Sequence, residues 1–466
     1  MVRQFSPLKL TLILGLVAVP AAAAPPQFVK SIVVPGEATD RYVGATGANF
    51  NRLGGPFSDL FYDRKEKVFY GLVDRGPGGG LISYETRVEK FRVNINSKTG
   101  AISNFRIVST ILFRTADGSQ PFNGLNPGLL NGDKSVLGRS FDPEGITLGP
   151  RGQLYLSDEY GPSLYQFKLV KVGQGQTQAR FVKAFPIPAN LLPMEGTKLN
   201  FVDGRGVLTS GRQDNRGFEG LTITPNGKLL YGCLQDPQVT EGANDDGRRS
   251  RNVRIVAWDV ATGQPKAQYI YQLETLDEIN ARIPGDENDF GATAQGRNIG
   301  LSAITALTGT EFLVLERDNR GRGVDDPLGA NPVASKRVYR ISIKGATDVS
   351  NTSLVGTNDL PAGVTPVSKT LFLDIAESLA AKSLPIGEKF EGLAIGPKLD
   401  KGFYAILTGT DNDFSVTQTG EGTQLDVYTD GTNGPIDGPA GTRKLLPIYM
   451  LSYKGKVPGF VPLQQK

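Results

Sequence analysis

Histidine is absent from this 466-residue chain, and its absence excludes much of the common hydrolase chemistry. The Ser-His-Asp and Cys-His arrangements need an imidazole to take a proton from the nucleophile, so neither can be built here. The usual zinc sites of hydrolases also need imidazole ligands. Catalysis by this chain would therefore depend on carboxylates, Lys, Arg, Tyr, hydroxyl groups or a metal ion that prefers oxygen ligands.

Cysteine is almost absent too. Cys233 is the only one, so the chain can form neither an internal disulfide nor a cysteine zinc cluster.

Net charge is also small: 51 Lys and Arg against 47 Asp and Glu give +4, or +2 without Arg3 and Lys9. The chain has no basic run that contains aromatic residues, so we expect no nucleic-acid partner.

Long hydrophobic runs are missing except near the N-terminus. Arg3 and Lys9 precede an apolar run over residues 10–19, and alanines at 21–23 follow Pro20. This order is typical of a secretory signal peptide, which we place at residues 1–23; an uncleaved anchor is the alternative. The run is too short for a membrane-spanning helix, and no later segment is long enough. We therefore expect a soluble mature chain, residues 24–466, that is secreted or periplasmic.

One pattern occurs five times along the chain. Its fullest copy reads FDPEGITLGPRGQLYLSDE from residue 141; clear copies begin at Phe218 and Phe390, and looser copies at Phe57 and Leu301. Each copy alternates apolar and polar residues, turns at Pro or Gly, and alternates again, which indicates a half-buried β-hairpin. The turn sequences P-R-G and P-N-G suit a tight reversal because proline fixes φ and glycine accepts a positive φ.

Repeated hairpins predict an all-β fold, and their spacing favours a β-propeller. The motif positions are residues 58, 144, 219, 302 and 391, and each interval has room for a blade of ~40–50 residues and a long loop. We expect a single domain over residues 24–466 with six blades, the sixth closed by terminal strands at 28–34 and 447–454. Such closure would remove exposed strand edges. Two β-sandwiches are the structural alternative.

The hairpins also predict where acidic residues meet. Residues at equal distances from a turn face each other in an antiparallel pair, which puts Glu144 opposite Asp158 and Ser302 opposite Glu316. The open ends of all hairpins should converge around the propeller axis. The acidic and basic residues at these ends are Asp74 with Arg75, Glu144 with Asp158 and Glu159, Glu219 with Asp236, Glu316 with Arg317 and Asp318, and Glu391 with Asp411 and Asp413.

Carboxylates gathered in this way repel each other unless a cation, a proton or an arginine compensates. Ca²⁺ takes about 6–8 oxygen ligands, so we expect a calcium site at the converging ends. For any one glutamate the alternative is structural: it caps backbone N–H groups or pairs with an arginine of a neighbouring blade.

Four segments resemble the phytase-like family, whose members are described by the esterase-like activity of phytase. They are FDPEGITLGPRGQLYLSDEYGP, NRGFEGLTITPNGKLLYG, LERDNRG and KFEGLAIGPKLDKGFYAILTGTDND, and the resemblance extends over residues 43–453. It implies an exported propeller that hydrolyses phosphoric or carboxylic esters of small molecules. The β-propeller phytases bind several Ca²⁺ ions through acidic residues, but their ligands cannot be matched one by one to this chain.

If the chain is such a hydrolase, its acidic ends suggest roles for individual residues. We expect Ca²⁺ to be held by Glu144, Asp158, Glu219 and Glu391, with Glu159 or Glu316 as the base and Arg317 or Arg75 stabilising the developing negative charge. Two other functions stay open. One is a non-catalytic propeller that binds a partner or glycan, which the absence of a G-x-S-x-G motif favours; the other is a Ca²⁺-dependent lactonase-like enzyme.

Overall fold

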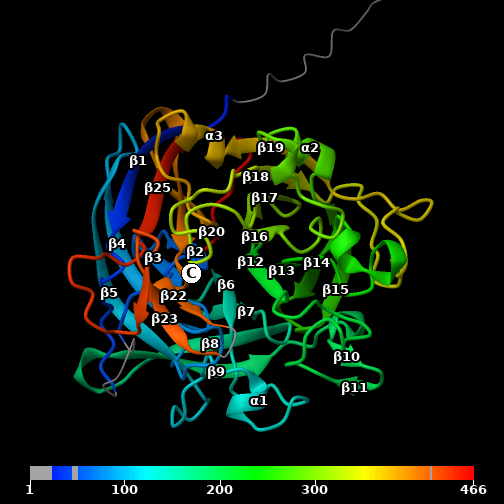
Figure 1. Ribbon diagram of the computed structural model, residues 1–466, viewed down its shortest axis with the longest axis horizontal. Helices are drawn as coiled ribbons and strands as arrows, with labels where there is room; N and C mark the ends of the chain where they lie inside the picture. The colour runs from blue at the N-terminus through cyan, green and yellow to red at the C-terminus, as the bar shows by residue number, and fades with distance from the viewer. Residues whose placement is uncertain (1–23, 45–50, 420–421, 466) are drawn as a thin grey trace, which may run out of the picture.

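The five recurring hairpins each supply the two inner strands of a four-stranded antiparallel unit (Figure 1). The computed structural model describes residues 24–44, 51–419 and 422–465. Hydrophobic clusters fill the space between neighbouring units, so the apolar residues of each strand are buried against the next unit. The described chain is therefore an all-β propeller, and the prediction of this fold is confirmed.

In the first four units the strands follow one another outward from the axis in chain order. The first unit has strands β2 (Asp59–Asp63), β3 (Val68–Leu72), β4 (Arg87–Ile95) and β5 (Ile102–Arg114). The second has β6 (Pro143–Leu148), β7 (Leu154–Asp158), β8 (Ser163–Lys171) and β9 (Thr177–Ala184). The third has β12 (Phe218–Ile223), β13 (Leu229–Leu234), β14 (Asn252–Asp259) and β15 (Pro265–Gln272). The fourth has β16 (Ile299–Ala306), β17 (Glu311–Asp318), β18 (Lys336–Ser342) and β19 (Ser368–Asp374).

The fifth unit brings together strands from both ends of the chain. Its strands are β20 (Lys389–Lys398), β21 (Tyr404–Asp411), β25 (Ile448–Gly455) and β1 (Gln27–Val34). The connections carry two small sheets, formed by β10 (Met194–Glu195) with β11 (Lys198–Leu199) and by β22 (Val416–Gln418), β23 (Gln424–Val427) and β24 (Asn433–Pro435). They also carry the short helices α1 (Pro127–Leu130), α2 (Leu276–Asn280) and α3 (Ile375–Ala380).

The ends of the chain close the ring, but differently from the prediction. β1 pairs with β25, and β25 pairs with β21, so the terminal strands complete the unit of the fifth hairpin and do not form a sixth. The physical reason is that β20 and β21 alone are a two-stranded hairpin, which is at best marginally stable without further strands. The described residues form five four-stranded units, and a short parallel pairing of β5 with β9 joins the outer edges of the first two.

The innermost strands contact one another in a closed ring. β6 contacts β2 and β12, and β20 contacts β2 and β16, while β12 contacts β16. The glycine of the E-G motif permits this close approach. A Cβ atom on Gly145 would lie 2.4 Å from the backbone oxygen of Glu219, and one on Gly220 would lie 2.5 Å from the backbone nitrogen of Ile304. The motif therefore serves ring closure as well as the placement of charge.

A β-bulge falls on the motif residue in four of the five inner hairpins. The pairing register shifts at Glu144, at Glu219 and Gly220, at Ser302 and at Glu391. In the first hairpin the strands pair without a shift from Asp59 onward, directly after Ser58. A bulge bends the strand and re-aims the side chain that it carries, and bulges are common next to active sites.

The bulges overturn the predicted pairing across the hairpins. Asp158 lies opposite Pro143 instead of Glu144, and Glu316 is likewise one position away from facing Ser302. The prediction assumed an unbroken ladder, in which residues at equal distances from the turn are opposite each other. One inserted residue shifts the partner by one position and so separates each predicted pair.

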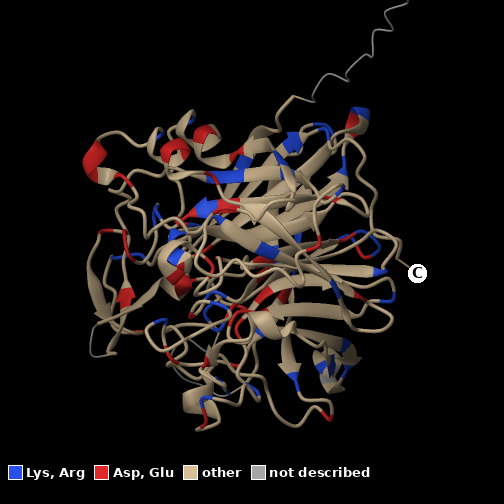
Figure 2. Ribbon diagram, turned by 90° about the vertical axis from the view of Figure 1, so that its right-hand side faces the viewer, with Lys and Arg blue, Asp and Glu red and all other residues tan. Residues whose placement is uncertain are grey.

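The loops and strands carry charges of both signs (Figure 2). The predicted signal peptide at residues 1–23 lies outside the described residues. Within the described part of the chain, no helix is long and apolar enough to cross a membrane.

A candidate acidic site at the open ends of the inner hairpins

The motif residues of the five hairpins lie at the starts of the inner strands, where those strands meet around the axis. All five are buried: Ser58, Glu144, Glu219, Ser302 and Glu391. The second strand of each hairpin ends at the same level because it runs antiparallel to the first. In this way the segment after β3 and the end of β21 bring Asp74 and Asp411 to the axis.

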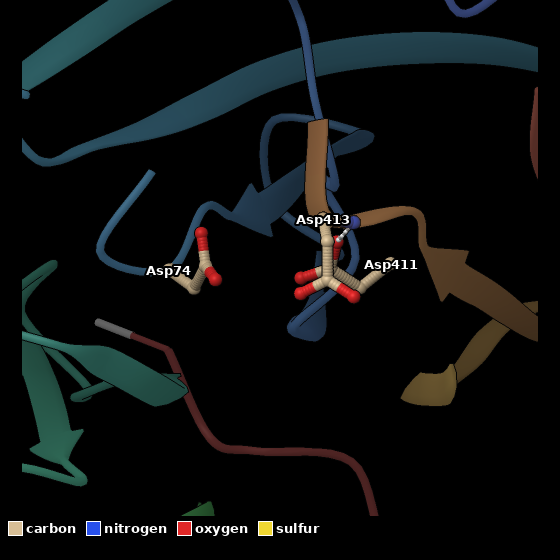
Figure 3. Close-up of side chains that lie close together, drawn as sticks. All are labelled: Asp74, Asp411 and Asp413. Atoms are coloured by element: carbon tan, nitrogen blue, oxygen red, sulfur yellow. Dashed lines mark hydrogen bonds between the residues drawn. The ribbon is translucent and has the colours of Figure 1, made fainter. Parts of the chain in front are cut away.

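Asp74, Asp411 and Asp413 form one tight acidic group (Figure 3). One carboxylate oxygen from each lies within 4.8 Å of the others. The carboxylates of Asp411 and Asp413 lie side by side and face that of Asp74 across a gap. Backbone groups fix two of them: the Asp413 N–H donates to Asp411 Oδ1 over 2.6 Å, and the Gly76 N–H donates to Asp74 Oδ1 over 2.8 Å.

A second acidic group shares Asp74 and adds Asp142 and Glu144 from the segment F-D-P-E-G. Again one carboxylate oxygen from each residue lies within 4.8 Å of the others. Glu144 is only 7% exposed, and among the described residues its carboxylate has no hydrogen-bond or ion-pair partner. Such a carboxylate is unfavourable unless it is protonated, hydrated or bound by a cation, and the Glu144 oxygens, unlike those of Asp236, are not fully shielded from solvent.

Basic side chains compensate only part of this charge. Arg75 Nη1 lies 3.1 Å from Asp142 Oδ2, and the ammonium group of Lys389 pairs with Asp413. The two acidic groups together contain five carboxylates, so these two cations leave an excess of negative charge. The arrangement therefore favours either bound protons or an additional cation.

Burial raises the pKa values of three of these acids. The pKa of Asp74 and that of Glu144 are raised well above their usual range, first by desolvation and then by neighbouring carboxylates. Desolvation, followed by the charge of Asp413, raises the pKa of Asp411 to about 8. Without a bound cation, Asp411 therefore keeps its proton at neutral pH, and the pKa shifts of Asp74 and Glu144 act in the same direction.

Glu219 and Glu391 were predicted as metal ligands, and both lie at the axis but outside the two acidic groups. Glu391 Oε1 is 2.5 Å from Arg317 Nη2, and Arg317 Nε donates to Ser302 Oγ over 2.8 Å. Glu219 accepts a hydrogen bond from the side-chain amide of Gln235, while its other oxygen has no donor among the described residues. Desolvation, and then nearby carboxylates, raise the pKa of Glu219 well above its usual range.

Glu159, predicted as a base, lies beside Arg216. Arg216 Nη1 is 3.7 Å from Glu159 Oε1, and Arg216 Nε is 3.0 Å from Asp236 Oδ2. Desolvation, followed by the charge of Asp142, raises the pKa of Glu159 to about 8. In this state Glu159 holds a proton at neutral pH, which suits a proton donor better than a base.

Asp158 and Glu316, also predicted as site residues, make structural contacts. The carboxylate of Asp158 accepts hydrogen bonds of 2.6–2.8 Å from three donors: the Asp142 N–H, the Gly161 N–H and the Ser163 hydroxyl. Glu316 accepts a hydrogen bond of 2.6 Å from the Tyr271 hydroxyl and lies 2.9 Å from Lys369 Nζ. Asp158 therefore ties its own hairpin to the following loop, and Glu316 ties the fourth unit to the third.

Asp142 and Lys389 take part in the site, but sequence reasoning did not find them. Asp142 is two residues before Glu144, and alternation along a strand would place both side chains on one face, so the signal was present. Lys389 directly precedes the F-E-G of its repeat, where other copies have different residues. Nothing in the repeat pattern could have assigned Lys389 to Asp413.

The donor set fits a hard divalent cation. Both acidic groups consist only of carboxylate oxygens, which Ca²⁺ prefers. The groups share Asp74, and the unpartnered carboxylate of Glu144 belongs to one of them. Fold and site together define an all-β propeller with an acidic axial site.

Comparison with known proteins identifies the family. The phytase-like family, described as having the esterase-like activity of phytase, matches residues 51–414. The chain belongs to this family, and the resemblance seen in the sequence motifs is confirmed. An uncharacterized secreted protein of Arthroderma benhamiae is 25% identical, over 85% of this chain and 88% of the relative.

Solved structures resemble this chain only loosely. The Dos1 propeller matches 88% of this chain and 70% of its own length at 9% identity, with a TM-score of 0.23. The hydrazine synthase of Kuenenia stuttgartiensis matches 80% of each chain at 13% identity, with a TM-score of 0.29. The fold is therefore defined by the strand pairing of this chain itself.

Proposed function

We propose that the chain is an exported hydrolase of small carboxylic or phosphoric esters whose acidic axial site binds Ca²⁺. The observation that carries the proposal is the pair of acidic groups that share Asp74, one of which contains the unpartnered carboxylate of Glu144. Family membership supports ester hydrolysis, and the secreted relative and the leader-like residues 1–23 support export.

The cation would be held by oxygens from the two acidic groups, namely Asp74, Asp142, Glu144, Asp411 and Asp413. When bound, a hard divalent cation supplies Lewis-acid polarisation of a carbonyl or phosphoryl oxygen. Of the four predicted ligands, this set keeps only Glu144. Asp158 is saturated by local donors, Glu391 is paired with Arg317, and Glu219 lies outside both acidic groups, so none of these three is assigned to the cation.

Two arginines at the site would orient an anionic substrate group. The side chains of Arg75 and Arg216 are 19% and 24% exposed, and each is anchored by a buried carboxylate, that of Asp142 or Asp236. A guanidinium group binds carboxylate or phosphate oxygens in a fork geometry. Arg317 is more buried and is engaged by Ser302 and Glu391, so we assign it to the positioning of Glu391.

Glu159 would donate a proton to the leaving group. Its pKa of about 8 keeps it protonated at neutral pH, and one of its oxygens has no hydrogen-bond donor among the described residues. An alcohol leaves more readily when a nearby acid protonates its oxygen, and a positioned acid typically contributes about 10²–10⁴ in rate. We therefore expect Glu159→Gln to lower kcat more than it raises KM.

The test is an assay of phosphomonoesters and p-nitrophenyl acyl esters with Ca²⁺ and with EDTA. Turnover should require Ca²⁺ and should be abolished in Glu144→Gln. The exposed Glu287→Gln serves as a matched control and should keep full activity. Absence of turnover of every ester, in protein that binds Ca²⁺, would exclude the hydrolase.

A Ca²⁺-dependent binding module is the second candidate. The observation that favours it is the pairing of Arg317 with Glu391 and of Arg216 with Glu159, which uses charged groups at the axis to hold neighbouring units together. Thermal stabilisation by Ca²⁺ without turnover of any ester would favour this alternative.

A further inference from the structure

The C-terminal segment crosses the axis on the side opposite to the acidic site. β25 ends at Gly455, and the described chain continues to residue 465. The C-terminus lies at the centre of the ring of units in Figure 1 and at one face of the molecule in the side view of Figure 2. The acidic groups lie at the open ends of the inner hairpins, whereas this segment lies at their turns.

Backbone and side-chain hydrogen bonds attach the segment to turns of three different units. The Val461 N–H donates to the backbone oxygen of Leu307 over 2.9 Å, in the turn after β16. The Gln464 N–H donates to the oxygen of Pro225 over 2.9 Å, in the turn after β12. The side chain of Gln465 accepts from the Lys65 N–H over 3.1 Å and donates to Asp63 Oδ1 over 3.0 Å, at the turn after β2.

An aromatic residue attaches the same segment to the fifth unit. The ring of Phe460 packs edge-on against Tyr404, with centroids 5.2 Å apart. The guanidinium group of Arg64 lies 5.1 Å from the centre of the Phe460 ring and donates hydrogen bonds to the backbone oxygens of Ile395 and Gly396. The segment therefore contacts four of the five units.

Beneath the segment lies a small, mainly apolar cavity of about 60 Å³, whose wall also includes Asp59 and threonine side chains. Each inner strand contributes an aliphatic residue to its wall: Leu60, Ile146, Leu221, Ile304 and Leu393. Phe460, Val461 and Leu463 of the segment complete the lining. Without these three side chains, the apolar wall of the channel would be exposed to water, which is unfavourable in proportion to the area exposed.

We propose that residues 459–465 are a strap that seals the turn side of the central channel and holds the ring of units together, so that the acidic site is reached from the opposite face only. The proposal is independent of the chemistry of the acidic site. The pairing of β1 with β25 closes the ring at its edge. The strap holds the same ring together a second time, by contacts across its axis.

Thiol labelling of the cavity wall tests the seal. Ala306 lines the cavity and is 8% exposed, so Ala306→Cys places a thiol beneath the strap. The native Cys233 is fully buried, and burial raises the pKa of its thiol, so it contributes little background. In a chain that ends at Pro458, we expect the thiol at position 306 to be labelled at least about tenfold faster than in the full chain, because access no longer needs local opening.

A point substitution keeps the test decisive if the shortened chain does not fold. Leu463→Asp puts a charge against the apolar wall and should release the strap, with the same gain in labelling rate. Leu328→Asp is the matched control, because Leu328 is 63% exposed and lies outside the cavity. Labelling at position 306 that is equally slow in the full chain and in folded Leu463→Asp protein would overturn the proposal, whatever the shortened chain does.

Discussion

Asp74 of the first unit faces Asp411 of the last unit across the seam where the ring closes. Their carboxylate oxygens lie within 4.8 Å of each other, and Asp413 joins them. Ionisation of these carboxylates therefore places repulsion between the first and the last unit, at the seam. A cation bound there would be held by residues from both ends of the chain, so its binding should stabilise the closed ring.

Substitution of Asp74 should have different effects on two quantities, the stability of the Ca²⁺-free protein and its stabilisation by Ca²⁺. Asp74→Asn removes one of several mutually repelling carboxylates, so the Ca²⁺-free variant should be at least as stable as the parent. At a Ca²⁺ concentration about a hundred times Kd, the parent should gain about 2.7 kcal/mol, and the variant much less. Thermal unfolding with and without Ca²⁺ measures both effects.

The control for this experiment is Asp117→Asn, which changes an exposed carboxylate far from the axis and should leave the response to Ca²⁺ unchanged. An equal Ca²⁺ response in parent and Asp74→Asn protein would show that Asp74 does not contribute to the cation site.

The Ca²⁺-free protein should become less stable as the pH rises from about 5 to about 8. Burial raises the pKa of Glu159 and that of Asp411 to about 8, from ordinary values of 4.5 and 3.8. Between the ordinary pKa values and the raised values in the folded protein, the folded state binds more protons than the unfolded state. The free energy of unfolding therefore falls with increasing pH in this range. Their contribution is complete below the unfolded pKa values and is lost as the pH passes about 8.

Urea unfolding at pH 5, 6.5 and 8 in EDTA measures this trend. Added Ca²⁺ should have its largest stabilising effect at pH 8, where it no longer competes with protons for the carboxylates. A free energy of unfolding that increases from pH 5 to pH 8 in EDTA would contradict the assignment of these acids as buried and protonated.

The convergence of acids could be predicted because it depends on chain connectivity alone. A repeated hairpin with its turn at one end must bring its motif residue and the end of its second strand to the other end, as Glu144 and Asp411 show. The individual partners could not be predicted, because a bulge of one residue decides which side chain points to the axis. Asp158 illustrates this: its sequence position fits a ligand, but the loop after β7 supplies donors to its carboxylate.

The number of units depends on a strand pairing that cannot be read from the repeat pattern. The terminal segments could be recognised as a closing pair, because both lie outside the five repeats, at opposite ends of the chain. Whether that pair starts a new unit or completes the fifth depends on its pairing with β21, which is a long-range contact without a local signal. The E-G motif also looked like a charge motif, whereas Gly145 shows that it is equally a packing motif.

The contributions of Arg317 and Glu391 to the free energy of unfolding should be strongly coupled, because the two residues form a buried ion pair. Arg317→Met leaves Glu391 buried without its cation, and loss of one partner of a buried pair typically costs about 3–5 kcal/mol. Glu391→Gln in the same chain removes the uncompensated charge and should restore part of the loss. The free energies of unfolding of both single variants and the double variant complete the cycle, and additive losses would show that the pair is not coupled.

Gly145 should be intolerant of even one added methyl group. A Cβ atom at this position would lie 2.3 Å from Ser157 Oγ and 2.4 Å from the backbone oxygen of Glu219, so Gly145→Ala must push β6 away from β12. Overpacking of this kind costs about 1–3 kcal/mol, which urea unfolding can measure. Gly309→Ala, in the turn after β16, is the matched control: a Cβ atom there would meet nothing within 4 Å, so stability should change by at most about 0.5 kcal/mol. Equal stabilities of the two variants would mean that the inner strands can separate freely, and the acidic site would then lack the rigid ring that positions its carboxylates.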